Sequence, residues 1–247
     1  MKVQIVRYAV MSDINGNLQA LEAVLADVKQ HDIDEIIFLG DAMGYGADSI
    51  ACFELIRRLA AVYLLGNFES RLIDATQRNS SSRLAAEMRM LHSQLAGESM
   101  DWLCHRKTSL SLGQLHFSYN FESKPMSKPI GLLDFLSRQQ SDYCHKLKGV
   151  HLIAGNHSPW IMDSSGVGFT EKESNFKFDF EPDSLCIVSV GSVGQPRDGD
   201  PRAGYAIVDE SSIVWRRIQY DVDGAIAAIV LNSELAPANA ERLRNGV

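Results

Sequence analysis

The chain has no long apolar run and no concentration of basic residues. No apolar stretch approaches the roughly 20 residues that a membrane-spanning helix needs, and Met1 leads directly into a short strand-like segment rather than a signal peptide. Lys and Arg number 24 against 31 Asp and Glu, a net charge of −7, without the basic cluster that binds a nucleic-acid backbone. We therefore expect a soluble, cytoplasmic protein that binds neither membranes nor nucleic acids.

Cysteine is scarce and scattered. The 4 cysteines lie far apart and form no C-x-x-C pair, which argues against a cysteine zinc site and suits reduced thiols. The 247 residues contain no internal repeat, low-complexity block or linker. We predict a single domain over residues 1–247, large enough to bury a substantial core.

Short apolar segments alternate with helical patterns in the first third of the chain. Buried strands are predicted at residues 3–11, 36–39 and 62–65, and helices at 17–28 and 49–59. This β-α-β-α-β order is typical of an open α/β sheet. Ligands bind such sheets beyond the carboxyl ends of the strands, and conspicuous polar residues stand at those positions here.

The rest of the chain is predicted to add further strands and helices. Residues 124–129 contain Pro and are expected to form a loop. We expect helices at 81–106, 130–138 and 222–231, strands at 110–112, 115–119, 150–154, 185–190, 205–209 and 213–218, and a polar, Ala-rich end that frays.

Four short polar motifs occur in order along the chain. They are Ser12-Asp13-Ile14-Asn15-Gly16-Asn17, Gly40-Asp41, Gly66-Asn67-Phe68-Glu69 and Gly155-Asn156-His157-Ser158. Singly, such motifs are common turns and helix caps, but the ordered set resembles the D-x-H-G-N, G-D, G-N-H-[DE] and G-H-x-H blocks of the calcineurin-like metallophosphoesterases. Residues 190–202 also closely match a stretch of the small bacterial members of that family. The resemblance implies an α/β fold, a four-layer α-β-β-α sandwich with two mixed β-sheets.

The resemblance also implies a site that holds two metal ions beside a phosphate, where they activate a water. Asp13 and Asp41 match the family's two aspartate ligands, with Asp41 in the bridging position, and Asn67 matches its amide ligand. All three are hard oxygen donors, which suit Mn or Mg.

Histidine is missing from most positions where this chemistry needs it. Asn15 stands at the histidine position of D-x-H, and its amide oxygen is a weaker donor than imidazole. Phe68 stands at the catalytic histidine position and can neither donate a proton nor bind a metal, so we assign no catalytic residue. Tyr119 aligns with a further histidine ligand, and a neutral phenol binds divalent metals poorly.

The last metal motif allows two alignments. Without a gap, Asn156 and Ser158 fall on the family's two histidines, and His157 takes the variable position. With a shift of one residue, His157 itself becomes a ligand. The sequence leaves both alignments open.

A phosphate site is predicted beside the metal motifs. The backbone around Gly191 and Ser192 could present successive N–H groups to an anion, and Arg197 and Arg202 could each add a bidentate contact. Asn67 would also reach the phosphate. The same stretch could instead be a structural loop that holds the sheets together, so both interpretations remain open.

The leading functional hypothesis is a phosphoesterase homologue whose two-metal centre is dismantled. Such a protein would be catalytically weak or inactive, would hold no metal if the dismantling is complete, and could still bind phosphate or a phosphorylated small molecule. The first rival is an active phosphomonoester or phosphodiester hydrolase that holds one Mg or Mn ion with Asp13, Asp41, Asn67 and waters.

A third hypothesis is a non-catalytic binding or regulatory protein. It would use the old active-site face for a partner, and an exposed patch of Phe68, Tyr119 and Trp160 would favour it. Glu69, which follows a phenylalanine instead of the catalytic histidine, is expected to cap the next helix.

Overall fold

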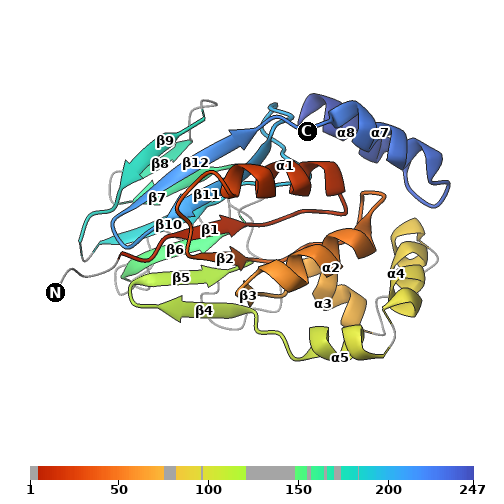
Figure 1. Ribbon diagram of the computed structural model, residues 1–247, viewed down its shortest axis with the longest axis horizontal. Helices are drawn as coiled ribbons and strands as arrows, with labels where there is room; N and C mark the ends of the chain where they lie inside the picture. Colours follow the sequence, from red (N-terminus) through yellow and green to blue (C-terminus); the bar gives the residue numbers. More distant parts are fainter. Residues whose placement is uncertain are drawn as a thin grey trace.

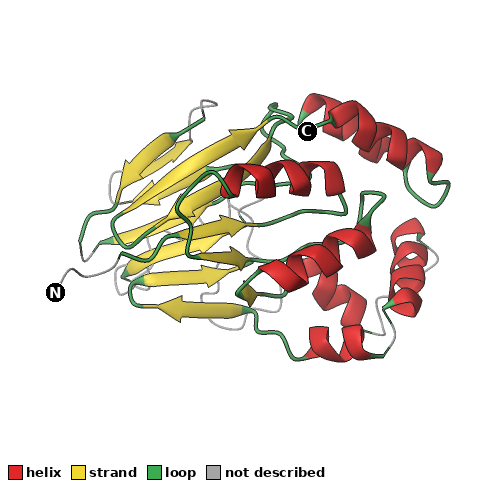
Figure 2. Cartoon of the chain, in the orientation of Figure 1, coloured by secondary structure: helices red, strands yellow, loops and turns green. Residues whose placement is uncertain are grey.

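The computed structural model describes residues 5–74, 82–95, 97–120, 148–154, 157–163, 166–169, 174–182 and 184–247. The predicted loop at 124–129, the predicted helix at 130–138 and Asn156 lie outside these ranges. Strands form two sheets, and the described helices gather to one side of them (Figures 1 and 2). None of the helices in the described ranges has the length and apolar character required to span a bilayer.

The first sheet has six strands in the order β3-β2-β1-β11-β12-β9. Its parallel part is β1, β2 and β3, and β11, β12 and β9 continue it with antiparallel pairing. The strand bounds are β1 Tyr8–Met11, β2 Glu35–Phe38, β3 Val62–Tyr63, β9 Phe176–Asp179, β11 Ala203–Val208 and β12 Ser212–Ile218.

The second sheet has the strand order β4-β5-β6-β10-β7-β8 and is also mixed. β5, β6 and β10 are parallel neighbours, and antiparallel strands flank them on both sides. The strand bounds are β4 Ser109–Leu112, β5 Leu115–Ser118, β6 Gly149–Ile153, β7 Trp160–Asp163, β8 Gly166–Phe169 and β10 Leu185–Ser189. β7, β8 and β9 were not predicted, and it is their pairing with β10 and β12 that defines them.

Alternation along the strands builds two cores. In β1, Val10 faces the second sheet and packs in one cluster with Phe117 and Leu152, whereas the next residue, Met11, faces the helices. The helices that cover the first sheet bury an apolar stripe against Met11 and Phe38. The predicted α/β fold class with two mixed sheets is confirmed, and three of its four layers lie within the described residues: helices, first sheet and second sheet.

The described helices follow the predictions at most positions. Their bounds are α1 Leu18–Val28, α2 Ser49–Leu59, α3 Asn67–Ile73, α4 Arg83–Gln94, α5 Glu98–Cys104, α7 Val222–Leu231 and α8 Pro237–Asn245. The single helix predicted at 81–106 is wrong, because the chain breaks into α4 and α5 at Gly97, whose φ of 83° is outside the helical region.

The prediction of a frayed carboxyl-terminal end is also wrong. α8 begins with Pro237 in its first turn and ends at Gly246, which takes the left-handed conformation that closes many helices. Ala240 and Leu243 of α8 are buried in a cluster with Ile229 of α7. The polar composition concealed this narrow apolar stripe, which is stable only because α7 covers it.

Glu69 in α3 ties together the turns that follow β2 and β3. Its carboxylate is fully buried and accepts the backbone N–H groups of Asp41 (2.9 Å), Ala42 (2.7 Å) and Gly66 (3.2 Å), and the hydroxyl of Tyr63 (3.2 Å). The contact with Gly66 is the helix cap that the sequence predicts for Glu69. Through the other three contacts, Glu69 anchors the turn after β2 and the end of β3. These three donors have no other acceptor within the described residues.

The loop between β2 and α2 is held from two sides. The backbone N–H of Tyr45 donates to Glu87 of α4 (3.1 Å), and the carbonyl of Tyr45 accepts from Asn239 of α8 (2.9 Å). Burial raises the pKa of Glu87 from 4.5 to about 7, and the hydrogen bond from Tyr45 only partly opposes this shift.

Substitution of Glu69 is expected to destabilise the fold strongly. Glu69→Ala leaves four donors without their acceptor, which predicts a loss of about 3–5 kcal/mol in the free energy of unfolding. Urea denaturation would measure it, with Glu241→Ala at an exposed position of α8 as the control, expected within about 0.5 kcal/mol of wild type. A Glu69→Ala loss below about 1 kcal/mol would contradict the anchoring role.

Glu87 predicts a pH dependence of stability. Because the pKa of this acid is higher in the folded state, its contribution is fully present below about pH 4.5 and is lost as pH rises through about 7, by about 2–3 kcal/mol. Glu87→Gln keeps an acceptor for Tyr45 and removes the titration. The measurement is the free energy of unfolding of both proteins between pH 4.5 and 8, and parallel curves would refute the assignment.

Candidate functional site

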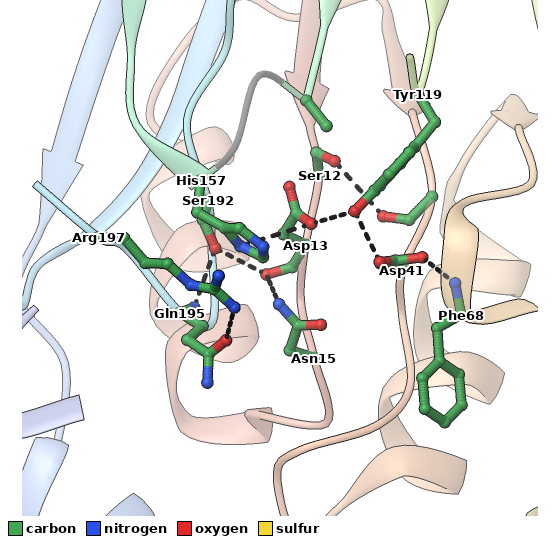
Figure 3. A network of polar contacts seen from close by, with 12 residues as sticks. Ser12, Asp13, Asn15, Asp41, Phe68, Tyr119, His157, Ser192, Gln195 and Arg197 are labelled. Atoms are coloured by element: carbon green, nitrogen blue, oxygen red, sulfur yellow. Dashed lines mark hydrogen bonds and ion pairs between the residues drawn. The ribbon is translucent and has the colours of Figure 1, made fainter. Parts of the chain in front are cut away.

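The turns at the carboxyl ends of the strands converge on one site. Asp13 and Asn15 follow β1, Asp41 follows β2, and Tyr119 follows β5 of the other sheet, so the site lies where the two sheets meet. Figure 3 shows these side chains together with His157, which precedes β7. The structure therefore brings together five of the residues that the sequence predicts as metal ligands, from segments far apart in the chain.

Backbone hydrogen bonds hold the first two turns in register. The N–H of Asp13 donates to Gly40 (3.0 Å), and the N–H of Asn15 donates to the carbonyl of Asp41 (3.0 Å). On the other side, the carbonyl of Asp13 accepts from the N–H of Gly194 (2.8 Å). A side chain at position 194 would collide with the backbone of Ile14, so only glycine allows this close approach.

The backbone of the site is strained. Asp13, Asn15, Asp41, Tyr45 and His157 have φ between 51° and 65°, and Asn175 alone shares this left-handed conformation among the other described non-glycine residues. Such backbone conformations cost free energy and persist only where the surrounding structure enforces them. Their concentration in one place marks the site as a functional candidate independently of its side chains.

Tyr119 stands between the two aspartates. Its hydroxyl lies 2.8 Å from Oδ1 of Asp13 and 2.6 Å from Oδ2 of Asp41 (Figure 3). Burial raises the pKa of Asp41 well above its usual value, with Glu69 and Asp13 adding to the shift, and burial raises the pKa of Asp13 as well. Since one hydroxyl hydrogen serves one acceptor at a time, the raised pKa values agree with a proton held on one of the carboxylates.

The second oxygen of Asp41 is also engaged. Oδ1 accepts the backbone N–H of Phe68 at 2.7 Å, the first turn of α3. The Phe68 ring turns away from Asp41 (Figure 3) and is buried in the helical core, 6.4 Å from the ring of Tyr45. Position 68 therefore contributes a backbone N–H to the site and packs its side chain elsewhere.

Asn67 already has a partner for its amide oxygen. The Asn120 side chain donates to Oδ1 of Asn67 at 3.0 Å, from the residue directly after Tyr119. Sequence reasoning missed Asn120, although it stands next to a predicted ligand in a motif that departs from the family pattern. Tyr119 and Asn120 together donate hydrogen bonds to oxygen atoms that the predicted metal centre would need as ligands.

The Asp13 side of the site is different. Oδ2 of Asp13, Oδ1 of Asn15 and Nδ1 of His157 are buried, and none has a hydrogen-bond partner among the described residues. Nδ1 of His157 lies 3.5 Å from Oδ1 of Asp13. Burial lowers the pKa of His157, Asp13 opposes this shift, and the charges of Arg197 and Arg242 reinforce it. The structure thus places His157 itself against Asp13, while the Ser158 carbonyl accepts from Ser189 (2.5 Å).

The residues predicted to bind phosphate lie in three different environments. Arg197 is exposed, and its guanidinium donates to the neutral Gln195 (2.7 Å). Arg202 forms a bidentate ion pair with Asp200, with contacts of 2.7 to 3.2 Å. The hydroxyl of Ser192 is buried and donates to the carbonyl of Asp13 (3.0 Å).

The loop that contains Gly191 mainly supports the site. The N–H groups of Val193 and Gly194 donate to the carbonyls of Ser12 (3.0 Å) and Asp13 (2.8 Å), so they are engaged with the turn after β1. Gly191 packs beside the ring of Pro159. These contacts support the interpretation of this stretch as a structural loop for the residues named here.

Two observations bear on a metal centre. No group of three or more His, Cys, Asp or Glu side chains within the described ranges is arranged to hold an ion. Tyr119 bonds to both aspartates, and Asn120 occupies the amide oxygen of Asn67. The residues present do not fit a two-ion centre, because these hydrogen bonds occupy oxygens that two ions would need as ligands.

The exposed aromatic patch proposed for a partner-binding protein is not present. Phe68 is 3% exposed, Trp160 4% and Tyr119 9%, so all three are buried. The Tyr119 hydroxyl is directed inward to Asp41, and the Phe68 ring packs in the helical core.

Comparisons with known proteins agree with this fold. The calcineurin-like phosphoesterase family model matches residues 6–186. An uncharacterised protein of Methanocaldococcus jannaschii is 29% identical over 231 residues, which cover 91% of this chain and 92% of that protein.

Solved structures show the same architecture over the whole chain. A metallophosphoesterase from Sphaerobacter thermophilus has a TM-score of 0.80 and 26% identity, covering 99% of this chain and 100% of that chain. A hypothetical protein, PH1004, from Pyrococcus horikoshii has a TM-score of 0.68 at 17% identity, covering 98% and 99%, and supports the fold alone. By the match over residues 6–186, this chain belongs to the calcineurin-like phosphoesterase family.

Proposed function

We propose that this protein is a phosphoesterase homologue without a working two-metal centre, which binds phosphate or a phosphorylated small molecule and hydrolyses phosphoesters weakly or not at all. The observation that carries the proposal is the Tyr119 hydroxyl, 2.8 Å from Asp13 and 2.6 Å from Asp41. In a two-ion mechanism, the paired ions would activate water and neutralise the charge that develops on the phosphate. Here Asp41, the carboxylate that would bridge the two ions, accepts hydrogen bonds from protein groups instead.

The side chains at the family's histidine positions support the same conclusion. Phosphoester cleavage benefits from a positioned proton donor near the leaving group. Phe68 offers only its backbone N–H, which is bonded to Asp41, and its ring is buried in the core. His157 lies beside Asp13, and burial lowers its pKa, so it is a poor proton donor at neutral pH.

Positive charge near the site supports binding of an anion. Arg197 follows the site loop, and its backbone N–H donates to the carbonyl of His157 (3.4 Å). Arg242 of α8 acts electrostatically on the same histidine, and α8 is fixed by a hydrogen bond between Gly199 and Gly246 (2.8 Å). Unlike Arg202, neither arginine forms an ion pair with a carboxylate within the described residues. A guanidinium without a protein anion is available for phosphate.

The one-ion hydrolase of the sequence analysis used Asp13, Asp41 and Asn67. Two of these three residues have their oxygens bonded to protein donors, which disfavours that ligand set. The partner-binding alternative relied on exposed aromatic residues that are in fact buried. A phosphoesterase homologue with a dismantled metal centre accounts both for the bonded oxygens and for the buried aromatic residues.

An activity assay tests the catalytic part of the proposal. With millimolar Mn²⁺, hydrolysis of generic phosphomonoester and phosphodiester substrates by wild type is expected to be no faster than hydrolysis by Asp41→Ala, because Asp41 supports no reaction. Wild-type turnover comparable to that of a relative with all its histidines, and lost in Asp41→Ala, would overturn the proposal.

A binding assay tests the ligand part. Inorganic phosphate is the probe, and Arg197→Ala is expected to weaken binding at least tenfold, since a charge-assisted contact contributes roughly 1.5–3 kcal/mol. Arg58→Ala, at an exposed position in the last turn of α2, is the control and should bind as wild type does. Isothermal titration calorimetry measures both. Equal phosphate affinities for wild type and Arg197→Ala would exclude Arg197 as the anchor.

A further inference from the structure

We propose that the ligand of this site carries two adjacent phosphate groups, and that Arg242 of α8 binds the second phosphate while Arg197 binds the first. The proposal rests on the proposed function in one respect, that the site binds a phosphorylated ligand. It adds the chemical class of that ligand, a diphosphate, and the residue that distinguishes a diphosphate from a monophosphate.

The carboxyl-terminal helix α8 is fixed against the loops of the site at both of its ends. Near its start, Nδ2 of Asn239 donates to the carbonyl of Tyr45 (2.9 Å), in the loop between β2 and α2. At its end, the carbonyl of Gly246 accepts from the N–H of Gly199 (2.8 Å), and a side chain at position 246 would collide with the backbone of Asp200. α8 therefore forms a fixed wall beside the site.

Arg242 lies on the side of α8 that faces the site. It stands three residues after Asn239, one turn further along the same face of the helix. Asn239 and the neighbour of Arg242, Leu243, line a small cavity together with Asn15 and Gln195 of the site loops. The side chain of Arg242 is exposed, so its guanidinium is accessible at the edge of this contact.

Arg197 reaches the same part of the site from the loop after β10. Its guanidinium donates to Oε1 of Gln195 (2.7 Å), and Figure 3 shows both side chains on the His157 side of the site, away from Tyr119. Beyond the effect of burial, the charges of Arg197 and Arg242 both lower the pKa of His157. The two guanidinium groups are therefore within electrostatic reach of one imidazole.

The other arginines near the carboxyl end already have anionic partners. Six arginines follow residue 190, and four of them form ion pairs with aspartates: Arg202 with Asp200, Arg216 with Asp27, Arg217 with Asp198 and Arg244 with Asp223. Among the described residues, no carboxylate forms an ion pair with Arg197 or Arg242. Two unneutralised charges of the same sign beside one histidine repel each other, and a bound anion relieves that repulsion.

The pair of arginines indicates the class of anion. One guanidinium forms a bidentate contact with one phosphate group, so two guanidinium groups suit two phosphates. Because both arginines act on His157, the two phosphates lie close together, as they do in a diphosphate. A monophosphate held by Arg197 leaves Arg242 without an anion, so Arg242 favours the ligand with the second phosphate.

The test is a calorimetric titration of the full chain with inorganic pyrophosphate and with inorganic phosphate, without added divalent ions. Wild type is expected to bind pyrophosphate at least about tenfold more tightly than phosphate, because it gains a second charge-assisted contact. Arg242→Ala is expected to weaken pyrophosphate binding at least about tenfold and to change phosphate binding less than about twofold. Arg242→Lys keeps the charge but loses the bidentate contact, so its pyrophosphate affinity should lie between these two.

Arg244→Ala is the matched control, because it removes the same charge two residues further along α8 from a guanidinium already paired with Asp223 (3.1 Å). Its pyrophosphate affinity is expected to stay within about twofold of wild type. Circular dichroism establishes that each variant is folded.

Three results would overturn the proposal: equal wild-type affinities for the two anions, an unchanged pyrophosphate affinity in Arg242→Ala, or an equal loss in Arg244→Ala. Phosphate binding without a preference for pyrophosphate refutes the diphosphate proposal and leaves the proposed function standing. Absence of binding of either anion refutes the ligand part of the proposed function as well.

Discussion

The position of Asp41, the carboxylate at the centre of the site, depends on the buried carboxylate of Glu69. It accepts from the backbone of Asp41 and Ala42 after β2 and from Gly66 before α3. Since the site is assembled from separate strand ends, some contact must fix one end against another. The Glu69 carboxylate makes that contact, and both of its oxygens are hydrogen-bonded. Asp41 is thereby oriented toward the second sheet, where Tyr119 meets it.

The same frame with different side chains gives different chemistry. Where the family resemblance implies histidines, Phe68 packs into the helical core and Tyr119 enters the space between the aspartates as a hydrogen-bond donor. A phenol hydroxyl between two carboxylates stabilises them without an ion, and burial keeps their pKa values high. The frame survives because Glu69, Gly194 and Ser192 hold it through contacts that do not involve the replaced positions.

Much of the architecture could be predicted, and the site could be predicted only in part. Apolar periodicity located β1, β2, α1 and α2 and placed Asp13 and Asp41 at strand ends, because these features are local. The docked α8 was missed because its burial depends on packing against α7. The break at Gly97 had a local signal, the glycine itself, which the apolar periodicity of 81–106 overrode in the prediction. Asn120 was missed for a similar reason, since its role is defined by an amide more than fifty residues earlier in the chain.

The sequence by itself determined the fold class, the family resemblance and the loss of imidazoles at the motif positions, because residue types and their order carry that information directly. Tertiary structure alone decided which oxygens remain free. The alignment of His157 was open in the sequence, and the folded chain places its Nδ1 within 3.5 Å of Asp13. Whether an acceptor is bonded or open depends on distances between strands far apart in the chain, and only folding brings those strands together.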